Sequence, residues 1–161
     1  MPESFTITPA ADATDLAEIR GLFTEYARGL GVDLCFQGFA EELATLPGLY
    51  APPRGALLLA RKQAVPAGCV AVRPRGEGVC EMKRLYVRPE FRGSGLGRAL
   101  AERIIETGRR LGYRRMVLDT LAHMRPALRL YDQLGFRPST PYYHNPLPEV
   151  VYLSLALDAA P

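Results

Sequence analysis

Hydrophobic side chains recur along the chain with two different spacings, which predict helices and strands in alternation. In the first third, Leu16 is followed at three, seven, ten and fourteen positions by Ile19, Phe23, Tyr26 and Leu30. Side chains at these intervals share one face of an α-helix. The spacing therefore predicts an amphipathic helix of about four turns, which the following glycine ends.

Shorter apolar runs, alternating or continuous, predict strands. The predicted strands cover 5–8, 55–61, 69–72, 79–87, 115–121 and 150–157, with a short strand edge at 136–137. Proline and glycine favour turns, so we expect one turn flanked by Pro66 and Gly68 and a tight turn over 74–78. Further helices are expected over 36–46, over 96–111, and from Pro126 to Gly135.

The resulting order, β-α-α-β-β-β-α-β-α-β-β, predicts an α/β fold with one mixed central sheet flanked by helices. Neither a repeat nor a linker interrupts it, so residues 1–161 are expected to form a single domain. Within 79–87 the apolar positions change phase: Cys80 and Met82 are even, whereas Leu85 and Val87 are odd. A strand that keeps one face buried through such a slip needs a β-bulge, here near 83–84.

Composition narrows the class of protein. Of the 161 residues, 48% are hydrophobic and 23% charged, which excludes a disordered, collagen-like or coiled-coil chain. The spacing of Cys35, Cys69 and Cys80 matches no zinc or redox motif, so we expect no metal and a reducing compartment. Without a signal peptide or an apolar run near the ~20 residues that span a bilayer, a soluble cytoplasmic protein with no membrane partner is expected.

The net charge of +3 is unevenly distributed, because residues 1–50 carry −6 and residues 83–115 carry +7. A cationic segment favours a polyanionic partner: nucleic acid, a membrane surface or a phosphorylated cofactor. A solvated helix face would give the same count. Since glycine and apolar positions interrupt the basic residues and no nucleic-acid motif is present, we expect no nucleic-acid partner.

Within the cationic segment, 92–98 reads Arg-Gly-Ser-Gly-Leu-Gly-Arg, between a predicted strand and a predicted helix. Three glycines let the backbone approach a ligand closely, and N–H groups at a helix start bind phosphate oxygens. Neither the dinucleotide fingerprint nor the P-loop pattern fits this loop.

The spacing Arg92-x-x-Gly95-x-Gly97 instead resembles the GNAT superfamily of acyl-coenzyme A N-acyltransferases. The resemblance is strongest over 81–100, and a second match at 127–136 is similar to the family's Leu-Tyr-x-x-x-Gly-Phe signature. It implies a GNAT-like fold, acetyl-coenzyme A as co-substrate and, as in many members, a homodimer. The implied coenzyme A contacts are the loop residues Arg92, Gly93, Ser94, Gly95, Leu96, Gly97 and Arg98 and the strand residues Leu85, Tyr86 and Val87.

Transfer of an acetyl group from a thioester to an amine sets three requirements. An alkylammonium, with a pKa of about 10.4, must lose a proton. The oxyanion needs hydrogen-bond donors, which strand N–H groups near Val87 supply. The leaving thiolate benefits from an acid, and the resemblance implies Tyr131 for this role. Glu81 is the candidate base, with His144 as its competitor.

The acceptor is expected to contact Phe36, Gln37, Tyr143, His144 and Asn145, from two segments near the cleft. The acidic residues around 30–53 favour a cationic amine. The hypothesis is therefore an N-acetyltransferase acting from acetyl-coenzyme A, by direct attack, on a primary amine of a small molecule or peptide. The alternative is a non-catalytic module that binds or senses acyl-coenzyme A.

Overall fold

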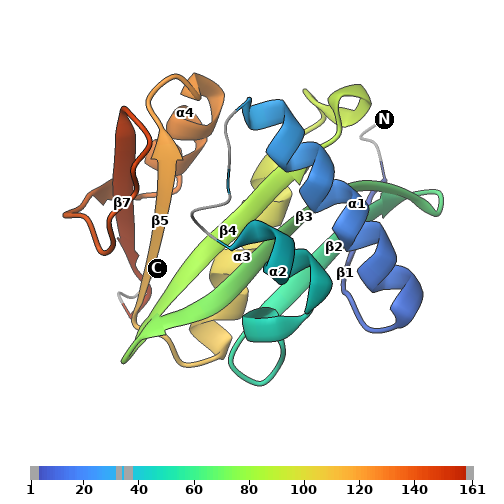
Figure 1. Ribbon diagram of the computed structural model, residues 1–161, viewed down its shortest axis with the longest axis horizontal. Coiled ribbons are helices and arrows are strands. Elements are labelled where there is room, and N and C mark those ends of the chain that lie inside the picture. Colours follow the sequence, from blue (N-terminus) through green and yellow to red (C-terminus); the bar gives the residue numbers. More distant parts are fainter. Residues whose placement is uncertain (1–3, 32–33, 35–37, 159–161) are drawn as a thin grey trace.

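The computed structural model describes residues 4–31, 34 and 38–158 of the 161. Seven strands form one mixed sheet with helices on both faces, which confirms the predicted α/β class (Figure 1). The strands are β1 (Thr6–Pro9), β2 (Ala56–Lys62), β3 (Val65–Gly76), β4 (Val79–Val87), β5 (Arg115–Leu121), β6 (Arg137–Pro138) and β7 (Val150–Ala156). The helices are α1 (Ala13–Leu30), α2 (Phe39–Ala44), α3 (Leu96–Arg110) and α4 (Arg125–Gln133), with short 3-10 turns at η2 (Gly48–Tyr50) and η3 (Pro89–Phe91).

The sheet has the order β1-β2-β3-β4-β5-β7-β6. Its neighbouring strands pair antiparallel except β4 and β5, which are parallel and are joined through α3. Two parallel neighbours need a long crossover that returns the chain to the same end of the sheet, and a helix usually provides it. In this order three strands lie on one side of the parallel pair and two on the other, so the pair lies at the centre of the sheet.

Each face of the sheet has its own core. Leu96, Leu100 and Ile104 of α3, the helix predicted over 96–111, are buried against one face. Ile19, Leu22 and Phe23 of α1 are buried against the other face, which α2 also covers (Figure 1). Packing on both faces leaves the edges and ends of the sheet as the places for a ligand.

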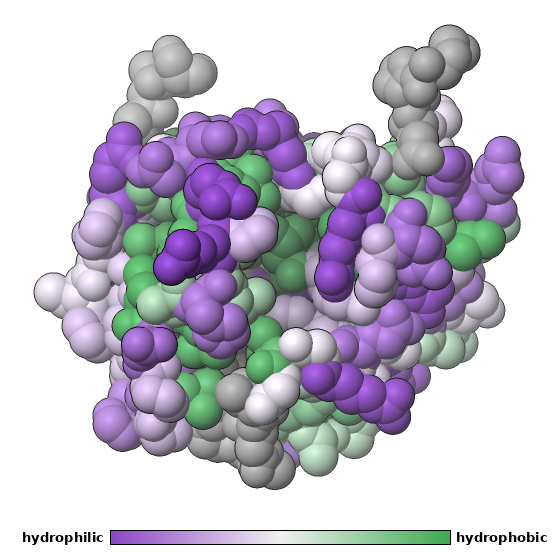
Figure 2. Space-filling view, turned by 90° about the horizontal axis from the view of Figure 1, so that it is seen from above, coloured by the Kyte–Doolittle hydropathy of each residue, from purple (hydrophilic) through white to green (hydrophobic). Residues whose placement is uncertain are grey.

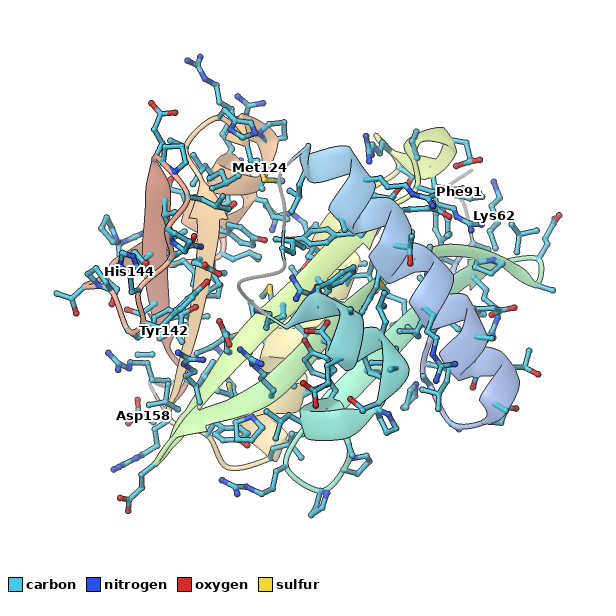
Figure 3. All side chains as sticks on the ribbon, in the orientation of Figure 1. Lys62, Phe91, Met124, Tyr142, His144 and Asp158 are labelled. Atoms are coloured by element: carbon cyan, nitrogen blue, oxygen red, sulfur yellow. The ribbon has the colours of Figure 1, made fainter. Side chains whose placement is uncertain are left out.

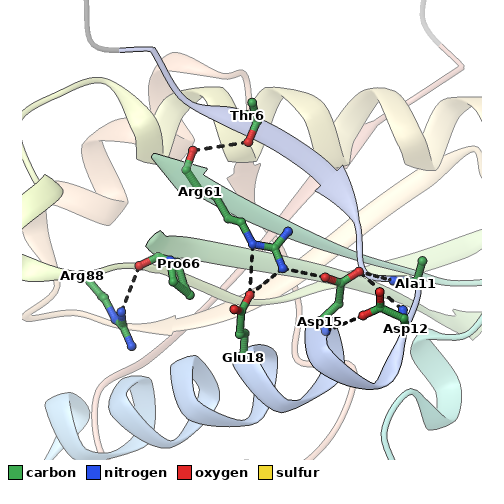
Figure 4. A network of polar contacts seen from close by, with 8 residues as sticks. All are labelled: Thr6, Ala11, Asp12, Asp15, Glu18, Arg61, Pro66 and Arg88. Atoms are coloured by element: carbon green, nitrogen blue, oxygen red, sulfur yellow. Dashed lines mark hydrogen bonds and ion pairs between the residues drawn. The ribbon is translucent and has the colours of Figure 1, made fainter. Parts of the chain in front are cut away.

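The start of α1 is fixed by polar contacts (Figure 4). Asp12 caps the helix by accepting a hydrogen bond from the Asp15 backbone N–H at 2.8 Å. Arg61 of β2 binds the carboxylates of Asp15 and Glu18 at 2.6 and 2.5 Å. These ion pairs hold the N-terminal half of α1 to β2, and they direct its C-terminal end toward the centre of the sheet.

The turns around β3 differ from those expected. The predicted turn between Pro66 and Gly68 is wrong, because the turn is Gln63–Ala64, with φ of 50° and 71°. Two residues in the left-handed region match the twist of a tight hairpin. The turn predicted over 74–78 is shorter than expected, since β3 continues to Gly76. Proline and glycine were misleading cues here because both occur inside the strand.

The pairing of β3 with β4 is irregular near the predicted phase slip. Cys69 pairs with Tyr86 and Ala71 with Lys83, so two residue steps on β3 match three on β4. Within this stretch Arg84 has a φ of 60°. As a result Leu85 and Val87 pack toward α3, while Tyr86 packs toward α1.

Candidate active site

The central parallel strands separate at one end and open the sheet. β4 pairs with β5 only over 79–81, opposite 115–117. Beyond this, within the described residues, the two strands diverge, and α4 lies at the far end of β5 (Figure 1). The backbone N–H and C=O groups of 85–87 that face β5 therefore have no strand partner on that side. Such groups need a partner when they are buried, and a ligand can supply it.

A cavity of about 440 Å³ begins at this opening, between the C-terminal end of α1, β4 and α4. Leu85, Tyr86 and Val87 line it together with Met124 and Ala127. Figure 2 looks onto this end and shows hydrophobic side chains around a hollow near the middle of the view. The volume lies in the range of about 300–1,000 Å³ that small-molecule sites occupy.

The segment 92–98, which we call the glycine loop, lies at the outer end of this cavity, which we call the groove. Gly93 and Gly95 have φ of 80° and 88°, which only glycine adopts without strain. Gly95 is the residue before α3 and has no side chain to cap the helix, although the Leu96 N–H donates to the Ser94 hydroxyl oxygen at 3.4 Å. Arg92 donates from Nε to the Val87 carbonyl oxygen at 2.9 Å and lies over the Tyr86 ring. The remaining N–H groups and the positive helix end can bind phosphate oxygens here.

Arg98 and Ser94 have contacts within the protein. The Arg98 guanidinium donates a hydrogen bond to the Gln133 side chain of α4. The Ser94 hydroxyl donates to the Phe91 carbonyl oxygen. The first contact connects the glycine loop to α4, so the two walls of the groove are joined at its outer end.

Tyr131 lies at the inner end of the groove. A second cavity, of about 80 Å³, is lined by Tyr131, Lys83, Arg84 and Asp119, and shares Leu85 with the first. The Tyr131 ring packs edge-on against Phe136, with 5.6 Å between ring centroids. Its hydroxyl makes no hydrogen bond to the described residues. Burial raises the pKa of Tyr131 above the ordinary value of 10, so the hydroxyl keeps its proton.

Three charged side chains line this inner cavity, and ion pairs connect further charged residues to this region. We call Arg73, Arg75, Lys83, Arg84, Glu42, Glu81 and Asp119 the charged cluster. Arg84 binds Glu42 of α2 through two hydrogen bonds, at 2.9 and 3.0 Å. Lys83 is 7% exposed, and burial lowers its pKa to about 8 despite the attraction of nearby Glu81. The sequence does contain a signal for these residues: charged positions inside strands that are otherwise apolar.

Glu81, the candidate base, belongs to the charged cluster but has no exposed surface. Its Oε1 accepts a hydrogen bond from Arg73 Nε at 2.8 Å, and its Oε2 accepts one from the Tyr142 hydroxyl at 2.6 Å. Burial alone would raise the pKa of Glu81, but Lys83, Arg73 and the Tyr142 hydroxyl together hold it below 4.5. A substrate amine can therefore reach this carboxylate only through another group, and its role as base stays a prediction.

The predicted acceptor residues fall into three groups. Phe36 and Gln37 lie outside the described residues. Tyr143 and Asn145 both donate hydrogen bonds to the Asp119 carboxylate, from Asn145 at 2.8 Å, so they border the charged cluster. His144 is exposed and lies beside β7 in Figure 3, so its predicted roles as base and acceptor contact gain no support.

Replacing Glu81 with glutamine is expected to lower the free energy of unfolding at pH 7 by about 3 kcal/mol, because it leaves the Arg73 charge unpaired at a buried site. The folded pKa of Glu81 is lowered, so its contribution is present above pH 4.5 and is lost as the pH falls through the folded pKa. Urea unfolding of both proteins between pH 3 and 7 measures this. We expect the difference between them to shrink in acid.

Glu77→Gln is the matched control, since Glu77 is exposed in the β3–β4 turn. Its unfolding free energy is expected to stay within about 0.5 kcal/mol of the wild type. Equal losses in the two variants, or a loss in Glu81→Gln that does not change with pH, would contradict a structural ion pair at Glu81.

The chain and its fold are similar to known proteins. The model of the Acetyltransferase (GNAT) family matches residues 16–136. An uncharacterized N-acetyltransferase of Schizosaccharomyces pombe is 48% identical, over 97% of each chain. An acetyltransferase of the GNAT family from Staphylococcus aureus superimposes with a TM-score of 0.80 at 16% identity, over 96% of this chain and 100% of that one. A protein of Salmonella typhimurium solved with its cofactor acetyl-CoA superimposes with a TM-score of 0.70 at 23% identity, over 98% of this chain and 96% of that one.

No helix in the described ranges is long and apolar enough to cross a membrane.

Proposed function

Since the chain belongs to the acetyltransferase (GNAT) family and is an acetyl-CoA-dependent N-acetyltransferase, we propose that it acetylates a primary amine of a small molecule or peptide by direct attack. The alternative of a non-catalytic binding module is therefore dropped. One observation carries the proposal: two adjoining cavities, which share Leu85, Met124 and Ala127, extend from Arg92 of the glycine loop along β4 to Tyr131. This arrangement brings together sites for a phosphate, an extended chain and a leaving group.

We assign the pyrophosphate of the donor to the N–H groups of 92–97 and Arg98, and its pantetheine arm to the backbone of Leu85, Tyr86 and Val87. Gly93 and Gly95 support this assignment because their backbone geometry directs N–H groups outward at the start of α3. The apolar lining from Met124 and Ala127 suits the methylene groups of the arm. The thioester then lies between β4 and Tyr131.

In the proposed step, the amine nitrogen forms a bond to the thioester carbon, and the carbon–sulfur bond breaks. A backbone N–H of 85–87 stabilises the oxyanion, and Tyr131 gives its proton to the leaving sulfur. The nitrogen loses one proton to the charged cluster and solvent, and solvent returns one proton to the Tyr131 oxygen, so the enzyme is regenerated and coenzyme A leaves as the thiol. Lys83 and Arg73 disfavour the charged form of an amine bound beside them, which raises the fraction of neutral nucleophile. Glu81 is retained as the candidate base, acting through the charged cluster rather than by contact.

The order of substrate binding tests direct attack. Initial rates of thiol release, measured while acetyl-CoA and a reactive amine are varied together, are expected to give intersecting double-reciprocal lines. Mass spectrometry of the amine is expected to show a mass increase of one acetyl group. Parallel lines together with an acetylated protein would instead indicate an acyl-enzyme intermediate.

Replacing Gly95 with alanine is expected to raise the KM for acetyl-CoA about 10-fold, with a much smaller change in kcat. An alanine at a φ of 88° costs about 1–2 kcal/mol, and the loop relieves this strain by turning its N–H groups away from the phosphates. Steady-state kinetics at saturating amine measures the effect.

Gly21→Ala supplies the control, because Gly21 lies inside α1 with nothing within 4 Å of an added Cβ. This variant is expected to keep its KM and to gain up to about 1 kcal/mol of stability. If both variants shifted the KM equally, the glycine loop would not be the phosphate site.

A further inference from the structure

We propose that the acceptor amine carries a carboxylate, and that this carboxylate binds between the Arg73 guanidinium and the Tyr50 hydroxyl. The inference rests on the proposed function and adds the chemical class of the acceptor. A short amino acid is the simplest compound of this class. The acidic residues of the first third of the sequence led to a different expectation, a cationic amine bound in an anionic pocket.

Tyr50 has a buried hydroxyl that lacks a partner. Its side chain is 3% exposed, and the hydroxyl makes no hydrogen bond to any of the described residues. The ring is held in place by an edge-on contact with Phe23, with 6.1 Å between centroids. A buried hydroxyl without a partner costs about 1–3 kcal/mol. A ligand oxygen that accepts its hydrogen bond would remove that cost.

Arg73 lies beside this hydroxyl and has donors to spare. Both residues line a cavity of about 380 Å³ between α2 and the sheet. Of the Arg73 nitrogens, Nε donates to Glu81, whereas the two terminal nitrogens make no hydrogen bond to the described residues. A guanidinium and a hydroxyl donor side by side match the two oxygens of a carboxylate.

Two carboxylates line the same cavity as Arg73, and neither is bound to its terminal nitrogens. Glu42 is bound to Arg84 through two hydrogen bonds. Glu41 is exposed at the rim, where solvent screens its charge. The terminal nitrogens of Arg73 are therefore the donors that a ligand carboxylate can use.

The strand register sets the length of the acceptor. Arg73 pairs with Glu81, and Ala71, two residues earlier on β3, pairs with Lys83 at the inner cavity. Two residues along a strand span about 6.6 Å. A carboxylate held at Arg73 thus places an amine a few bonds away on the Lys83 side, in the direction in which β4 continues to the proposed thioester position at Leu85. This spacing fits a small amino acid and not a long polyamine.

Matched pairs of acceptors test the inference. Thiol release is measured with glycine, β-alanine, L-alanine and L-aspartate, and with the primary amides of the same acids, at saturating acetyl-CoA. We expect kcat/KM for at least one acid to exceed that for its amide by about 10-fold or more. The amide has the less basic amine, so easier deprotonation cannot explain a preference for the acid.

Three outcomes distinguish failure of the carboxylate site from failure of the proposed function. A preference for the acid supports the carboxylate site. Acetylation of the amides, or of simple alkylamines, at rates equal to or above those of the acids would overturn it and leave the proposed function standing. If no amine were acetylated while acetyl-CoA still bound, both the proposed function and the inference would fall.

Tyr50→Phe assigns the effect to the site, because it removes only a hydroxyl that makes no hydrogen bond in the described structure. We expect the KM for the preferred acid to rise about 5- to 10-fold, with kcat unchanged and the kinetics of the matched amide unaffected. The thermal unfolding temperature of the free protein is expected to rise by about 2–4 °C for each kcal/mol of the relieved cost. A purely structural role would change acid and amide alike. Equal changes for both acceptors, or none for the acid, would overturn the assignment.

Discussion

Replacing Tyr131 with phenylalanine is expected to lower kcat by about 100-fold or more, with little change in the KM for acetyl-CoA. A positioned proton donor contributes about 10²–10⁴-fold to a rate, and the substitution removes only that donor. The ring, which packs on Phe136, is retained, and the hydroxyl makes no hydrogen bond to the described residues. Stability is therefore expected to stay unchanged. Steady-state kinetics and thermal unfolding of the same preparation measure both effects.

The pH dependence offers a second readout of Tyr131. Burial raises its pKa above the ordinary value of 10, so it stays protonated and its titration adds no limb to the rate profile between pH 6 and 9. Tyr113→Phe is the control: this tyrosine donates to the Arg54 carbonyl oxygen, beyond the far end of α3 from the glycine loop, and its loss is expected to leave kcat unchanged. Full turnover in Tyr131→Phe would remove Tyr131 from the mechanism.

Replacing Gly68 with alanine is expected to lower the free energy of unfolding by about 2–3 kcal/mol and to raise the KM for acetyl-CoA. An added Cβ would lie 2.6 Å from the Tyr86 carbonyl oxygen and 3.2 Å from Leu100 Cδ1. Backbone has to move to relieve such a contact, and overpacking of this kind costs about 1–3 kcal/mol. The backbone that moves is the part of β4 that lines the groove.

Gly76→Ala is matched to this change, because it lies in the same strand and nothing approaches its Cβ within 4 Å. We expect this control to match the wild type in both unfolding and KM. Chemical denaturation with parallel kinetics compares the two variants. If Gly68→Ala lost stability but kept its KM, the edge of β4 would not form the donor groove.

The parts of the fold that follow local patterns could be predicted from the sequence. The apolar stripe from Leu16 to Leu30 marked α1, and the glycines of 92–98 marked the start of α3. The phase change near 83–84 marked the place where the β3–β4 pairing is irregular. Each of these depends on neighbouring positions along one segment, which is the information that spacing and residue type carry.

Features that depend on distant segments could not be predicted. The Arg84–Glu42 contact joins residues 42 positions apart, and Tyr142 reaches Glu81 across 61. Without these partners, Glu42 counted toward an anionic acceptor site, although it is neutralised within the fold. The Gln63–Ala64 turn was missed for a different reason, because neither residue type favours a left-handed backbone.

Amide hydrogen exchange with and without coenzyme A tests most directly whether the opening between β4 and β5 is the donor site. We expect coenzyme A to slow exchange in two stretches, the glycine loop over 93–98 and the β4 edge over 85–87, with α2 and β1 unaffected. This measurement requires neither an acceptor nor turnover. Unchanged exchange in both stretches, with protection elsewhere at saturating coenzyme A, would contradict the proposed site.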